Sequence, residues 1–156
     1  MTIKSLTLIL HLLSAVIWVG GMFFAYMALR PVAAQQLEPP QRLTLWVGVF
    51  NHFFPFVWLS IILLLGTGYY MLFSTWGSFA QTPVYVHMMN GLGIAMILIY
   101  MHVFFAPYKR LKQAVIKQDW PDGGKRLNQI RKLIALNLSL GLLVVLIAGG
   151  GRYFTL

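Results

Sequence analysis

Apolar residues dominate four long stretches of the chain, and polar or charged residues gather between them. The 66 residues between Arg42 and Lys109 include no Asp, Glu, Lys or Arg. This run is too long for one membrane helix and suits two, because about 20 residues cross the hydrocarbon core of a bilayer. Polar and helix-breaking residues from Ser74 to Pro83 predict the break within it. The four predicted spans cover residues 5–29, 43–72, 84–108 and 128–150.

We predict that these spans form an all-α, up-and-down four-helix bundle in a single membrane domain covering residues 1–156. The composition supports a membrane protein, since 59% of the 156 residues are hydrophobic and only 10% are charged. A soluble domain carries about 25% charged residues, and a disordered chain is far less hydrophobic. The chain has no cysteine. Any metal it binds must therefore use histidine, methionine or oxygen ligands.

Charge predicts the orientation of the bundle. The net charge is +9, but the basic residues cluster beside the spans rather than over a soluble face, which argues against nucleic-acid binding. The loop 109–132 carries eight Lys and Arg residues. Short basic loops stay in the cytoplasm, so both termini are expected on the periplasmic or outer side, with the basic residues against anionic lipid headgroups. Within this loop, Trp120 to Gly124 predicts a tight turn between helical extensions of spans three and four.

Four histidines lie at membrane depth, where ionisable residues are costly and indicate function. His11 and His87 are expected near the outer face, and His52 and His102 in the cytoplasmic half. Spans one and three should lie diagonally across the bundle, which leaves a gap between their facing side chains. Two imidazoles on facing helices are a common axial set for haem iron. We therefore predict His11 and His87 as axial ligands of haem b, with His52 and His102 as a second candidate site.

Neighbouring residues extend the candidate site on both helices. His11, Ser14, Trp18 and Met22 follow helical spacing and form one stripe on span one. Asn90 and Gly91 flank the His87 face of span three. Trp18, Asn90 and Gly91 are accordingly predicted to contact the cofactor.

Two other interpretations of these residues stay open. A membrane histidine can simply hydrogen-bond a neighbouring helix. Copper is the alternative metal, because thioethers favour Cu(I), although methionine is also ordinary packing material. The methionines near or within spans are Met22, Met27, Met71, Met88, Met89, Met96 and Met101.

The segment LHLLSAVIWVGGMFF, with His11, Trp18, Gly20 and Gly21, resembles the first helix of the CopD family of bacterial inner-membrane proteins. The segment RKLIALNLSLGLLVVLIAGG resembles the last helix of that family. The chain is also similar to short HemJ-type haem-binding proteins, through the same histidine and the four-span size. These resemblances imply a bacterial inner-membrane domain that handles copper or haem.

Three functions follow as hypotheses. The first is a small membrane cytochrome that carries one haem b, or two if the second pair also binds, and exchanges electrons with a quinone or a redox protein. If it were an enzyme, it would be a haem-dependent membrane oxidoreductase. The second is a copper-handling transporter or copper-binding protein in which His and Met side chains line a path. The third is a non-catalytic, partner-binding subunit whose histidines make only interhelical hydrogen bonds.

Overall fold

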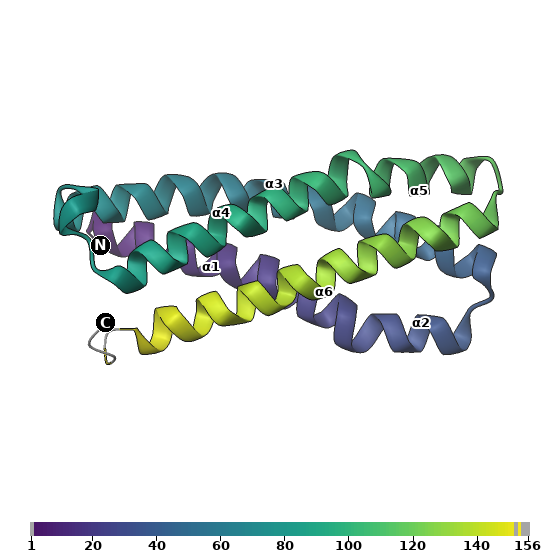
Figure 1. Ribbon diagram of the computed structural model, residues 1–156, viewed down its shortest axis with the longest axis horizontal. Coiled ribbons are helices and arrows are strands. Elements are labelled where there is room, and N and C mark those ends of the chain that lie inside the picture. The colour runs from purple at the N-terminus through teal and green to yellow at the C-terminus, as the bar shows by residue number, and fades with distance from the viewer. Residues whose placement is uncertain (1, 152, 154–156) are drawn as a thin grey trace.

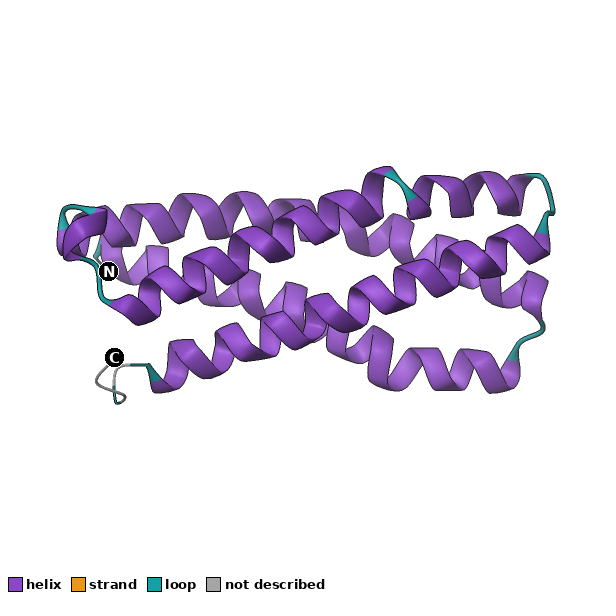
Figure 2. Cartoon of the chain, in the orientation of Figure 1, coloured by secondary structure: helices purple, strands orange, loops and turns teal. Residues whose placement is uncertain are grey.

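The computed structural model describes residues 2–151 and 153, and within them every regular element is a helix. Four long helical segments run side by side along the molecule, joined by short connections (Figure 1, Figure 2). The prediction of an all-α four-helix bundle is confirmed. The elements in order are α1 (Ile3–Phe24), η1 (Ala25–Leu29), α2 (Arg30–Gln36), α3 (Pro39–Trp76), η2 (Phe79–Gln81), α4 (Val84–Phe105), α5 (Pro107–Ile116) and α6 (Trp120–Gly150).

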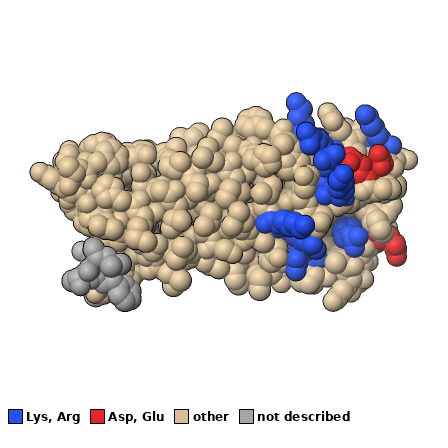
Figure 3. Space-filling model, in the orientation of Figure 1, with Lys and Arg blue, Asp and Glu red and all other residues tan. Residues whose placement is uncertain are grey.

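Four continuous helical segments are long and apolar enough to cross a membrane, so the chain is a multi-pass membrane protein. They are 31 to 38 residues long, whereas about 20 suffice for the hydrocarbon core. The additional turns lie mostly in α2, in α5 and at the start of α6, at the end of the molecule opposite the two termini (Figure 1). We call this the basic end, because Lys and Arg gather there (Figure 3).

The first span continues past its predicted limit at residue 29, through a wide helical turn. Pro31 has no N–H, and its ring would clash with the carbonyl of residue 27 in a regular α-helix. The preceding turn η1 is a π-helix in which the Arg30 N–H donates to the Ala25 carbonyl. Such wider turns accommodate a helix interruption without ending the helix. The chain therefore stays helical into α2, which diverges from α6 at the basic end (Figure 1).

The turn between the last two spans differs from the prediction. It occupies residues 117–119, where Gln118 has a φ of 57°, and α6 already begins at Trp120. The prediction of a turn at Trp120 to Gly124 is wrong, because Asp119 caps the helix by accepting from the Asp122 N–H at 3.2 Å. Pro121 is tolerated in a first helical turn, where no intrahelical donor is needed. The helical hairpin itself is confirmed, since α5 packs along α6.

The bundle consists of two closely packed helix pairs. One pair is α1 with α3, and the other is α6 with α4 and its continuation α5. Aromatic side chains fill the space between α3 and the segment formed by α4 and α5. Phe54 is at its centre, with its ring centroid 5.3 Å from that of Tyr100 and 4.7 Å from that of Tyr108. The Tyr100 hydroxyl also donates to the Phe54 carbonyl at 3.2 Å.

A glycine lets α6 approach the helices on both sides of it. A Cβ atom at Gly141 would lie 3.0 Å from Val19 Cγ2 on α1 and 3.1 Å from Met96 Cε on α4. Small residues at such positions let membrane helices pack closely. Gly141 therefore helps to set how near α1, α4 and α6 come to one another in the middle of the bundle.

Candidate functional site

The polar stripe on α1 faces the interior of the bundle. Ser14, Trp18 and Met22 are buried, and His11 is half-buried nearer the terminal end. Trp18 reaches across the bundle and meets Tyr100 of α4 edge-on, with ring centroids 6.2 Å apart. Helical spacing thus places an imidazole, a hydroxyl, an indole and a thioether along one inward line.

The hydrogen bonds of His11 define which of its ring nitrogens is free. His11 Nδ1 lies 2.8 Å from Thr67 Oγ1 on α3. The Thr67 hydroxyl proton is already donated to the Leu63 carbonyl, so Thr67 Oγ1 accepts and His11 Nδ1–H donates. His11 Nε2 then keeps its lone pair, which is the form that binds a metal. Gly68 makes room for the ring, because a Cβ there would lie 3.2 Å from His11 Cε1.

The other three histidines are exposed on the bundle surface. His87 Nε2–H donates to the Phe79 carbonyl at 3.0 Å, and the His87 ring stacks on Phe79. His52 Nδ1–H donates to the Gly48 carbonyl of its own helix at 2.9 Å. His102 is exposed near the C-terminal end of α4. His11 is therefore the histidine that the fold turns towards the interior, and it is bonded to a different helix from the one that carries His87.

Asn90 and Gly91 have separate surroundings. The Asn90 Oδ1 atom accepts a hydrogen bond from the Tyr69 hydroxyl at 3.1 Å, which links α4 to α3. Gly91 is exposed, and a Cβ there would have no neighbour within 4 Å. Asn90 thus joins two helices in the same half of the bundle as His11, whereas Gly91 lies on the outer surface.

The cavity inside the bundle between Trp18 and Tyr100 is much smaller than a cofactor pocket. The cavity beside Trp18 and Tyr100 has a volume of about 30 Å³, enough for one or two water molecules. Cofactor pockets typically measure about 300–1,000 Å³. Among the described residues, no cluster of three or more His, Asp or Glu could hold a metal ion. Haem ligation by His11 and His87, or by His52 and His102, stays a prediction from the sequence.

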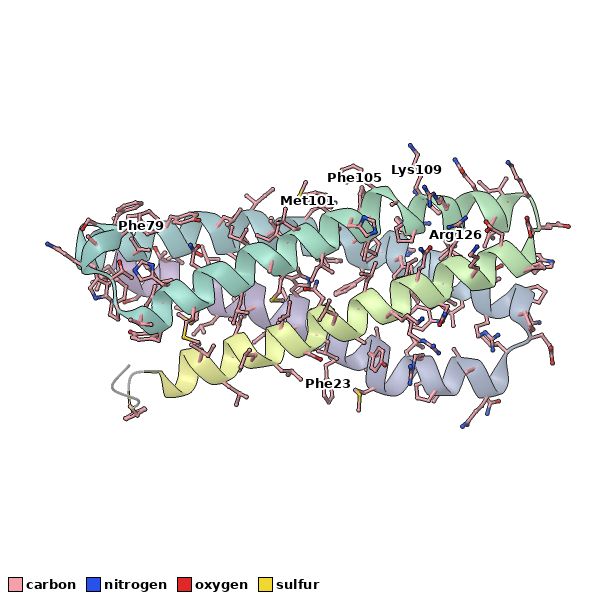
Figure 4. The ribbon with its side chains drawn as sticks, in the orientation of Figure 1. Phe23, Phe79, Met101, Phe105, Lys109 and Arg126 are labelled. Atoms are coloured by element: carbon pink, nitrogen blue, oxygen red, sulfur yellow. The ribbon has the colours of Figure 1, made fainter. Side chains whose placement is uncertain are left out.

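Burial sets two of the methionines near or within the spans apart from the others, of which Met71 and Met89 are half-buried and Met88 is exposed. Met22 on α1 and Met96 on α4 are only 4% and 3% exposed. Met27 and Met101 are 56% and 37% exposed, and Met101 points away from the bundle (Figure 4). The two buried thioethers belong to different helices on the inner face of the bundle. The sequence alone did not distinguish them from the lipid-facing methionines.

Asn137 is a polar residue of the interior that sequence reasoning missed. It is buried on α6, and its Oδ1 atom has no hydrogen-bond partner among the residues that the structure describes. It lines the 30 Å³ cavity together with Met22 and Trp18. The sequence does contain a signal for Asn137, namely an amide within the apolar run of the fourth span. A polar group at membrane depth is costly and therefore indicates a role.

Together these groups define a class of protein. It is a multi-pass helical membrane protein whose bundle interior offers one imidazole nitrogen, two thioethers and one amide oxygen, with no buried carboxylate among the described residues. A family model described as copper resistance protein D (CopD) matches residues 47–150. The chain belongs to the CopD family, as the sequence predicted. Comparison with curated proteins and comparison with solved structures each found no match.

The matched region adds a second line of support for the family. It covers most of α3 and the helices that follow, and it begins after α1, η1 and α2. The motif of His11, Trp18, Gly20 and Gly21 lies outside it. Family membership therefore does not depend on that motif, and the role of His11 has to be argued from the structure.

Proposed function

We propose that this protein handles copper within the membrane, with Cu(I) as the transported or bound ion. Its ligands are His11 Nε2 at one level of the bundle and the thioethers of Met96 and Met22 at another, because the 11 residues from His11 to Met22 rise about 16 Å along α1. The observation that carries the proposal is the burial of these two methionines on the inner faces of α1 and α4, while Met27 and Met101 face outward. Membership of the copper resistance protein D family agrees with it.

The chemistry of the donors favours Cu(I) over harder cations. Thioether sulfur is a soft ligand and imidazole suits copper, whereas Mg²⁺ and Ca²⁺ require carboxylate or carbonyl oxygens. Thioethers are neutral, so they can stay buried without a counter-charge. A charged ion inside a membrane needs such ligands at each level, because its transfer into hydrocarbon is otherwise very costly. Separate donors along the stripe would let the ion move by exchanging one ligand at a time.

We test the proposal with matched histidine variants of the purified protein in detergent. Cu(I) affinity is measured by competition with a chromophoric chelator under reducing conditions. His11→Ala is expected to weaken binding by about tenfold or more, since even residues behind a metal ligand contribute about 10–100-fold. His52→Ala is the control, because His52 is exposed and bonds only its own helix. Equal affinity in both variants would contradict the role of His11.

An optical spectrum of the same samples separates copper handling from the cytochrome hypothesis. Protein from haem-sufficient cells is expected to show no Soret band. A Soret band that is lost in His11→Ala would assign His11 to haem and overturn the copper proposal.

We also propose that the protein resides in a bacterial inner membrane with the basic end in the cytoplasm and both termini in the periplasm. The support is that ten of the twelve Lys and Arg residues lie at the basic end. The chain has no cysteine, so one introduced cysteine reports a single position. In intact cells, an impermeant maleimide is expected to label Ala80→Cys and to reach Lys117→Cys only after the membrane is opened. Labelling of Lys117→Cys in intact cells, with Ala80→Cys labelled only after the membrane is opened, would show the opposite orientation.

A further inference from the structure

A second, larger cavity lies at the basic end. Its volume is about 280 Å³, and it is lined by η1 and α2, by the first half of α3 and by the first half of α6. Its deep wall is apolar and belongs to the core, since Leu43, Trp46, Phe50 and Ile130 are all buried. The volume approaches the size of a ligand pocket and far exceeds what a few water molecules need.

Three arginines line this cavity, and no Asp or Glu does. Arg30 lies over the Tyr26 ring, with its guanidinium carbon 4.3 Å from the ring centroid. Arg42 donates from Nη1 to the Ala34 carbonyl at 3.4 Å. Among residues 2–151 and 153, the one ion pair is formed elsewhere, between Arg126 and Asp122. The three guanidinium groups therefore have no carboxylate partner in the described part of the chain, and they share one cavity.

The cavity lies next to the smaller one in the apolar interior. Ala25, Phe50 and Ile134 line both this cavity and the smaller one beside Met22. On the other side, the cavity is lined by both α2 and α6, which diverge at this end and do not pack closely (Figure 1). A ligand suited to this shape has an anionic head at the arginines and an apolar tail that leaves between α2 and α6.

We infer that this cavity is a specific site for one acidic phospholipid. The planar guanidinium groups of Arg30, Arg42 and Arg131 meet the phosphate, because arginine binds phosphate oxygens through paired donors. The first part of an acyl chain lies against Trp46 and Phe50, and the rest continues into the bilayer. General attraction of a basic surface to anionic lipid would involve every Lys and Arg at this end equally. A specific site in the cavity instead predicts that Arg30, Arg42 and Arg131 contribute most of the affinity for the acidic lipid. The inference stands independently of the copper proposal.

Native mass spectrometry of the delipidated full chain tests this inference. The probes are phosphatidylglycerol and phosphatidylcholine with identical chains, and inorganic phosphate as a competitor. One phosphatidylglycerol is expected to bind at least about tenfold more tightly than phosphatidylcholine, given about fivefold for each basic group close to an anionic surface. Phosphate at millimolar concentration is expected to leave the phosphatidylglycerol bound. Displacement by phosphate would show a site for the free anion, and equal binding of the two lipids would show no headgroup recognition; either result overturns the inference.

Charge-matched variants distinguish the cavity from the rest of the basic end. The triple variant Arg30→Gln, Arg42→Gln, Arg131→Gln is expected to lose the preference for phosphatidylglycerol. The control is Lys109→Gln, Arg110→Gln, Lys117→Gln, which removes the same charge from exposed positions outside the cavity. An equal loss in both triple variants would overturn the inference.

A further variant keeps every charge and blocks the apolar part of the cavity. Gly124 lines the cavity, and a Cβ atom there would have no neighbour within 4 Å. Gly124→Leu should therefore fold normally, as leucine also favours the helix over glycine. It is expected to weaken phosphatidylglycerol binding while leaving Cu(I) binding unchanged. Unchanged lipid binding in this variant would contradict the placement of the acyl chain.

Discussion

Replacing Met22 and Met96 together with leucine is expected to lower the Cu(I) affinity of the protein by at least about tenfold, with the fold preserved. Leucine has nearly the volume of methionine, so the packing of α1, α4 and α6 around Gly141 should change little. The thioether sulfur atoms, which supply the soft ligands of the proposed path, are lost. The measurement is chelator competition on purified protein, together with copper accumulation in cells that produce each variant.

The control is the double variant Met27→Leu, Met101→Leu. These side chains are on the same two helical segments, but they are exposed, and Met101 points away from the bundle (Figure 4). Their replacement should leave the Cu(I) affinity within about twofold of that of the unmodified protein, because a lipid-facing thioether contributes packing alone. If both double variants lose copper binding equally, burial of the thioether does not matter and the path through the bundle interior is wrong.

Phe54→Ala is expected to lower the free energy of unfolding by about 2–3 kcal/mol. In soluble proteins a buried Phe→Ala change costs about 3–5 kcal/mol. In a bilayer the part due to transfer out of water is small, because lipid is as apolar as the core, so the lost packing remains. That packing is extensive here, since the Phe54 ring contacts Phe50, Tyr100, Phe104 and Tyr108.

Phe56→Ala is the matched control on the same helix. Phe56 is 58% exposed and Phe54 only 4%. Its loss should change stability by no more than about 0.5 kcal/mol, as for other surface positions. Unfolding in mixed detergent, followed by circular dichroism, measures both variants. Equal stabilities would mean that the aromatic cluster does not hold α3 against α4 and α5.

The same two phenylalanines show why part of the fold could not be predicted from the sequence. In a soluble helix, alternation of polar and apolar residues tells the inner face from the outer. In a membrane helix, the face towards lipid is as apolar as the face towards the protein. Phe54 and Phe56 are chemically identical, yet one is central to the core and the other is exposed. The hydropathy pattern therefore located the spans but not their interior faces.

The candidate site shows the same division. Residue type alone selected four histidines at membrane depth, because any ionisable group there is costly. The structure then placed only His11 against another transmembrane helix, through Thr67, and left His52, His87 and His102 exposed. It also added Asn137, which the sequence analysis did not select, and the cavity beside it.

The number of spans, the all-helical class and the loop breaks could be predicted from the chain, because each depends on local hydrophobicity and on helix-breaking residues. Membership of the CopD family was also predicted from residue patterns. The turn at residues 117–119 was missed by a few residues, because Pro121 can begin a helix as well as end one. Which histidine turns inward, which methionines are buried and which arginines share a cavity depend on contacts between residues far apart in the chain. Those contacts exist only once the four helices pack, so the tertiary structure alone decided them.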